Sequence, residues 1–83
     1  MRRAFVLINS EKGLEAEVLE ALEEIPEVKE TYQVYGVYDI IAKVEAENMP
    51  ELKEIIIQKI KLLDKIQSMT TMICLNPGGS DQA

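Results

Sequence analysis

Apolar side chains recur at two different spacings along this chain, and these spacings predict its elements. Short runs of continuous or alternating apolar residues, rich in β-branched and aromatic types, are typical of strands. Segments in which an apolar residue returns every three or four positions among glutamates and lysines are typical of amphipathic helices. We expect strands at residues 4–9, 28–35, 39–46 and 66–75, and helices near residues 13–25 and 49–64.

Local signals mark where the helices begin and end. Pro26 ends the first helix, because the residue before a proline disfavours the helical conformation. Asn48 precedes the second helix, and Glu51 follows three residues later, which resembles a capping box with asparagine as the cap. The resulting order is strand, helix, strand, strand, helix, strand.

This order predicts an α+β fold of the ferredoxin-like type. Two right-handed βαβ crossovers share a central hairpin, so both helices cover one face of a four-stranded antiparallel sheet with strand order 4-1-3-2. We expect this βαββαβ domain to span residues 1–76. Residues 77–83 are polar and rich in chain breakers, so we expect a disordered tail.

The sheet face without helices is expected to be apolar. Side chains alternate along a strand, so Ala4, Val6 and Ile8 point one way and Phe5 and Leu7 the other. The last strand is apolar on both sides. We place these residues on the exposed face: Phe5, Leu7, Met69, Ile73 and Leu75. A large exposed apolar patch predicts a partner, and the simplest is a second copy packed sheet against sheet about a two-fold axis. The alternative cover, the C-terminal tail, is too polar.

Charge and composition exclude several classes of function. The net charge of −6 and the pI near 4.6 argue against direct binding to nucleic acid, which requires Lys and Arg on phosphates. No run reaches the length of a membrane span, and no signal peptide is visible, so we expect no membrane partner. The single cysteine, Cys74, forms no intrachain disulfide and fits a cytoplasmic protein.

The sequence contains few of the residue combinations that catalysis requires. The chain has no histidine for general base work, no nucleophile paired with a base and no phosphate loop, so we predict no catalytic residue, metal site or cofactor. Fold alone does not exclude an enzyme, because dimeric α+β barrel oxygenases and isomerases share the βαββαβ dimer. Those enzymes keep a polar cavity under the sheet, whereas a filled apolar core is expected here.

The junction "YGVYD", residues 35–39, separates the two central strands and has two interpretations. Gly36 supplies the positive φ that many hairpins need, and Asp39 commonly binds turn amides, so an ordinary turn explains both residues. Backbone N–H groups and a carboxylate can also bind a ligand, so a binding site is the second interpretation. The residues alone favour the ordinary turn, with a ligand site as the alternative.

The string "YGVYDIIAKVEA", after "TYQVYG" and before "ELKEII", resembles the ligand-sensing half of the Lrp/AsnC family, called the RAM domain. The similarity covers residues 4–75 and includes "AFVLIN" and "SMTTMICL". Full-length members carry an N-terminal helix-turn-helix domain that binds DNA. The first strand here begins near residue 4, so we expect a stand-alone RAM protein.

The resemblance implies a sheet-to-sheet dimer, dimers joined into larger rings, and a free amino acid or related metabolite bound between dimers. It implies these ligand-binding residues: Tyr35, Gly36, Val37, Tyr38 and Asp39, with Ser68, Thr70 and Thr71 supplied by a neighbouring chain. A further implied partner is a full-length Lrp-like regulator that shares the dimer surface. The alternatives are the α+β barrel enzyme and a purely structural oligomerisation module. Ser68, Thr70 and Thr71 also have a simpler explanation, as ordinary strand residues whose hydroxyl groups bind no ligand.

Overall fold

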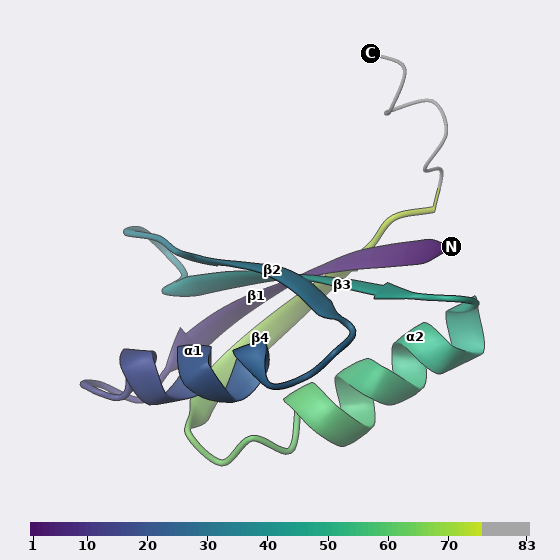
Figure 1. The fold of residues 1–83 in the computed structure, drawn as a ribbon. Helices are drawn as coiled ribbons and strands as arrows, with labels where there is room; N and C mark the ends of the chain where they lie inside the picture. Colours follow the sequence, from purple (N-terminus) through teal and green to yellow (C-terminus); the bar gives the residue numbers. More distant parts are fainter. Residues whose placement is uncertain (76–83) are drawn as a thin grey trace.

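The computed structural model, which describes residues 1–75, is a four-stranded antiparallel sheet with helices on one face (Figure 1). Its elements are β1 (Arg2–Ser10), α1 (Glu15–Glu23), β2 (Val28–Gln33), β3 (Ile40–Ala46), α2 (Met49–Ile55), the π-helical segment η1 (Ile56–Ile60) and β4 (Ile66–Ile73). The sheet order is β2-β3-β1-β4, which confirms the predicted ferredoxin-like topology. The predicted tail, residues 77–83, lies outside the described residues.

The second helix begins where the sequence predicts and ends earlier. Asn48 Oδ1 accepts a hydrogen bond from the Glu51 N–H at 2.9 Å, and Glu51 Oε1 accepts one from the Glu47 N–H at 3.0 Å, so the predicted cap is present. The last turn then widens into η1, in which the Lys61 N–H donates to the Ile56 carbonyl five residues back at 2.8 Å. The helical segment therefore ends at Ile60 and not near residue 64.

The core lies between the sheet and the helices. Ala4, Val6 and Ile8 of β1 are fully buried, as the alternation predicts. Each fully buried aliphatic side chain of valine size or larger contributes about 1.5–3 kcal/mol. The other fully buried core residues are Val18 and Leu22 of α1, Ile40, Ala42 and Val44 of β3, Leu52 of α2 and Ile60 of η1.

The register of β4 corrects part of the predicted exposed face. Ile8 pairs with Met69 and Ala4 pairs with Ile73, and directly paired residues point to the same side of a sheet. Met69 and Ile73 therefore face the helices and pack against the core, so their predicted place on the helix-free side is wrong. Met72, which pairs with Phe5, is on that side instead and is 53% exposed.

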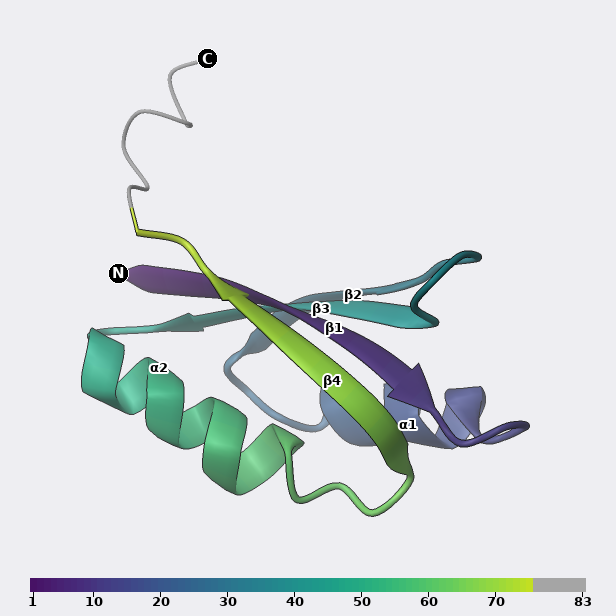
Figure 2. The same cartoon turned by 180° about the vertical axis from the view of Figure 1, so that it is seen from behind.

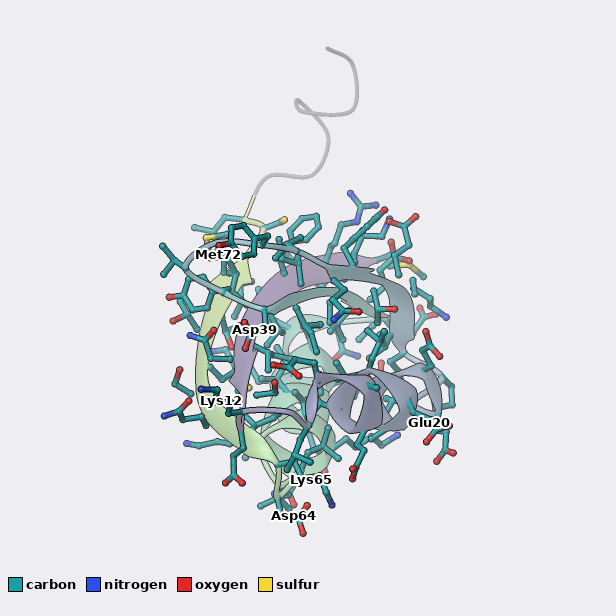
Figure 3. All side chains as sticks on the ribbon, turned by 90° about the vertical axis from the view of Figure 1, so that its left-hand side faces the viewer. Lys12, Glu20, Asp39, Asp64, Lys65 and Met72 are labelled. Carbon is teal, nitrogen blue, oxygen red and sulfur yellow. The ribbon has the colours of Figure 1, made fainter. Side chains whose placement is uncertain are left out.

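We call the helix-free side of the sheet the open face. In Figures 1 and 2 the helices lie below the sheet and the open face points upward, and Figure 3 shows Met72 at the edge of the molecule away from α1. Phe5 and Leu7 lie on it as predicted, whereas Leu75 follows the end of β4 and is exposed. The register gives the open face these residues: Arg3, Phe5, Leu7 and Asn9 of β1, Glu30 and Tyr32 of β2, Ile41, Lys43 and Glu45 of β3, and Ser68, Thr70 and Met72 of β4.

Two further features bear on function. Within residues 1–75, no helix is long and apolar enough to cross a membrane. The same residues contain no group of three or more Cys, Asp or Glu side chains arranged to hold a metal ion.

Candidate functional site

The candidate site is the β2–β3 loop, residues 34–39, at the end of the sheet far from the N-terminus (Figures 1 and 2). Backbone hydrogen bonds hold the base of this loop. The Val34 N–H donates to the Asp39 carbonyl at 2.8 Å, and the Asp39 N–H donates to the Ile8 carbonyl at 3.0 Å. Asp39 therefore closes the loop and joins it to β1.

The Asp39 side chain is tied to the end of β1 through one of its two oxygens. Asp39 Oδ2 accepts from the Ser10 N–H at 3.2 Å and from the Ser10 hydroxyl at 3.5 Å. Ser10 is only 4% exposed, so these donors lie away from bulk water. Asp39 Oδ1 takes no hydrogen bond from any residue between 1 and 75. The half-buried carboxylate is fixed in orientation, with one oxygen left for a further donor.

Tyr38 joins the loop to β4 across the end of β1. Its phenol oxygen lies 3.0 Å from Thr70 Oγ1, and Thr70 pairs with Leu7 on the open face. Two residues predicted for the ligand site thus meet, and they do so within one chain. A hydroxyl pair of this kind can donate to and accept from a third group.

The tip of the loop is fully in solvent. Tyr35 is 105% exposed and Val37 is 83% exposed. Gly36 lacks the positive φ expected of it; among the described glycines that conformation belongs to Gly13, with φ of +84°. A Cβ built at Gly36 would have no atom within 4 Å. Neither backbone conformation nor crowding within this chain requires glycine at position 36.

The other predicted β4 residues are separated from the loop. Ser68 Oγ accepts a weak hydrogen bond from Asn9 Nδ2 at 3.4 Å on the open face. Thr71 pairs with Val6 and therefore points to the helix side, where it lines a groove of about 470 Å³ between η1 and β4. The structure brings Thr70 to the loop, but the sheet lies between the loop and the Thr71 side chain.

Ser10 is the site residue that the sequence did not indicate. It closes the apolar run of β1, and as a polar residue at the end of a strand it predicts only a chain turn. The pairing of β1 with β4 shifts register between Asn9 and Ser10, at the point where Ser10 contacts Asp39. No spacing in the sequence links positions 10 and 39.

A family model, the Lrp/AsnC ligand binding domain, matches residues 3–78 of the chain. The chain belongs to the Lrp/AsnC ligand-binding family. This membership confirms the resemblance and makes the chain a ligand-sensing module of regulatory type.

Solved structures agree with the Lrp/AsnC assignment. The crystal structure of FFRP-DM1 is 45% identical, covers 90% of this chain and 100% of its own, and has a TM-score of 0.86. AsnC from E. coli is 35% identical over 92% of this chain with a TM-score of 0.83, and the match spans 52% of that regulator. A transcriptional regulator from Neisseria meningitidis, solved as a complex with L-Met, is 15% identical over 92% of this chain and 51% of its own, with a TM-score of 0.79, which shows the shared fold alone. A comparison with curated proteins gives no match.

Proposed function

We propose that this chain is a non-enzymatic Lrp/AsnC-type module that binds a free amino acid at the β2–β3 loop and assembles through its open face. The observation that carries the ligand proposal is the Asp39 carboxylate, which Ser10 holds by Oδ2 while Oδ1 has no partner among residues 1–75. An α-ammonium group supplies the charged donor that such an oxygen accepts best.

The loop also offers donors for the other end of an amino acid. The N–H groups of Gly36, Val37 and Tyr38 make no hydrogen bond within the described chain. Consecutive free N–H groups attract a carboxylate. The missing side chain at Gly36 lets a ligand approach this backbone, which gives the glycine a purpose that its conformation and neighbours do not. Tyr35 and Tyr38 would flank the ligand's side chain.

Assembly completes the proposed site. Phe5, Leu7, Ile41 and Met72 form the apolar part of the open face, and pairing with a second copy removes them from water. Dimers then meet near the exposed loop, where the β4 hydroxyls Ser68 and Thr70 of a neighbouring chain would close the pocket; Thr71, on the helix side of β4, would take no part in it. The N. meningitidis regulator, which shares the fold, was solved with L-Met, and an amino acid is the ligand class that we propose for this chain too.

The partners follow from the same surfaces and from the charge. A full-length Lrp-like regulator would be the alternative partner for the same open face, and that pairing would place this cytoplasmic sensor in a regulatory complex. Direct binding to nucleic acid is not part of the proposal, because the net charge is −6.

A thermal-shift screen of the purified protein against the twenty amino acids tests the ligand proposal. A ligand that binds only the folded state raises the melting temperature. Calorimetry with the best amino acid should then show that Asp39→Ala loses about 1–3 kcal/mol of binding free energy, the usual cost for a charged hydrogen bond. Asp64→Ala, which removes an exposed carboxylate beside Lys65, is the matched control and should bind as the wild type does. A flat response to all twenty amino acids, or unchanged affinity in Asp39→Ala, would refute the ligand proposal.

A further inference from the structure

Four charged side chains of alternating sign cross the open face in one row. Arg3 of β1 contacts Glu45 of β3 at 3.1 Å, Lys43 of β3 lies 3.9 Å from Glu45, and Lys43 lies 3.5 Å from Glu30 of β2. The order across three strands is positive, negative, positive, negative. We call these residues the charge row.

The side chains of the charge row are held in place by contacts with one another and with Tyr32. The Tyr32 hydroxyl donates to Glu30 at 2.7 Å and extends the row at its end. This hydrogen bond, with the nearby Lys43 ammonium, lowers the pKa of the Glu30 carboxyl. The side chains of Arg3, Lys43 and Glu45 are only 16–29% exposed, whereas Glu30 at the end of the row is 48% exposed.

The charge row borders the apolar part of the open face. Lys43 pairs directly with Phe5, whereas Arg3 lies at the start of β1, at the opposite end of that strand from Ser10 and the Asp39 loop. Any partner that covers Phe5 must therefore also meet the charge row, and it does so away from the candidate ligand site.

Alternating charge makes the row complementary to itself. In a face-to-face dimer the two-fold axis lies in the plane of contact, so a residue on one side of the axis faces the residue at the mirrored place in the second copy. If the axis crosses the row at right angles between Glu45 and Lys43, Glu45 faces Lys43 of the second copy and Arg3 faces its Glu30. Each of the four contacts then joins opposite charges.

We infer that the charge row selects a second copy of this chain as the occupant of the open face and sets the register of the two sheets. The inference rests on the proposed assembly and adds to it the residues that decide partner and register. Apolar contact alone favours association without distinguishing partners, whereas like charges brought face to face in a contact that excludes water oppose it strongly. A partner face with another charge order leaves this row mispaired.

Charge reversal with complementation tests the inference. In the proposed homodimer, position 43 of each copy faces position 45 of the other. Lys43→Glu therefore brings two acidic groups together at both places, and Glu45→Lys brings two basic groups together. Each variant should dimerise at least about tenfold more weakly than the wild type. Mixed in equal amounts, the two variants should form a heterodimer, because two acidic positions then face two basic ones. Native mass spectrometry at about 50 mM salt, with chains of different mass, reads out each species, since low salt limits screening.

Three further proteins keep the test decisive. The double variant Lys43→Glu/Glu45→Lys restores opposite charges across the axis and should regain the homodimer. Lys53→Glu and Glu54→Lys reverse exposed charges on α2, away from the open face, and should leave dimerisation unchanged. Circular dichroism of every variant separates failure to fold from failure to pair.

The outcomes distinguish this inference from the assembly on which it rests. A dimeric wild type whose single variants stay dimeric, or a mixture that yields no heterodimer, overturns the charge row alone. A wild type that is monomeric at micromolar concentration overturns the assembly together with the inference.

Discussion

The Tyr38 hydroxyl and the Thr70 hydroxyl lie 3.0 Å apart although 32 positions separate them in the chain. The contact ties the β2–β3 loop to β4, which is an edge strand of the sheet. A change at the β4 edge, such as the arrival of a neighbouring chain, would therefore reach the loop through one hydrogen bond. The Tyr38–Thr70 hydrogen bond therefore connects the proposed ligand site to the proposed assembly surface.

Removing the Tyr38 hydroxyl should loosen this link. Tyr38→Phe keeps the ring and should lower the free energy of unfolding by about 0.5–1.5 kcal/mol, with the low end expected because the pair is exposed to water. Urea denaturation measures the change, and Tyr38→Phe should cost nothing further in a Thr70→Val background. Tyr35→Phe is the control, since the Tyr35 side chain is fully in solvent. Equal effects of Tyr38→Phe in both backgrounds would show that the two hydroxyls are not coupled.

Asp39 should contribute to stability as well as to ligand binding. Asp39→Ala leaves the N–H and the hydroxyl of the buried Ser10 without their acceptor, and an unpaired buried polar group costs about 1–3 kcal/mol. Asp39→Asn retains one carbonyl oxygen and should lose less. Chemical denaturation without ligand checks both values, and an undiminished stability of Asp39→Ala would show that Ser10 finds another partner.

The fold was predictable because local patterns agree with one another. In β1, alternation placed Ala4, Val6 and Ile8 in the core and Phe5 and Leu7 on the other side, and the structure has them there. β4 is apolar on both sides, so its own sequence does not say which side meets the helices. The pairing with β1 decides this, and that register depends on tertiary contacts; the prediction therefore exchanged Met69 and Ile73 with Met72.

The candidate site was predictable only where its residues are neighbours in sequence. Gly36 and Asp39 are three positions apart and stand in a family pattern, so the loop could be proposed. The partners of that loop, Ser10 and Thr70, come from strands far along the chain and meet it through the sheet. The π-helical end of the second helix also left no mark in the apolar spacing that predicted the helix to continue.

Acid should weaken the protein partly through Glu27. The hydrogen bond from the Lys59 ammonium at 3.1 Å lowers the pKa of the Glu27 carboxyl below its ordinary value of 4.5. A lowered pKa in the folded state gives stability that is present above pH 4.5 and is lost as the pH falls through the folded-state pKa. Below pH 4.5 the urea midpoint of the wild type should therefore fall more steeply than that of Glu27→Gln.

Two matched conditions check that assignment. Glu54→Gln removes a carboxylate that has no ion pair within residues 1–75 and should keep the wild-type slope. The difference between wild type and Glu27→Gln should shrink in 1 M salt, because the pair is partly exposed and salt screens it. Identical acid profiles of wild type and Glu27→Gln at low salt would rule out this contribution.

The two methionines of β4 give the sharpest test of how the sheet is used. Met69 faces the core and Met72 lies on the open face, although both belong to one strand and differ little in sequence context. Met69→Glu places a charge against apolar side chains within the chain and should lower the stability of the fold, whereas Met72→Glu should fold stably and fail to dimerise. Leu7→Glu, between Ile41 and Thr70 on the open face, should behave as Met72→Glu does. Circular dichroism reports folding and light scattering reports mass; Leu62→Glu, which changes an exposed leucine outside the sheet, should leave both unchanged. A folded Met72→Glu variant with the wild-type mass would contradict assembly through the open face, and a Met69→Glu variant as stable as the wild type would contradict the register of β4 itself.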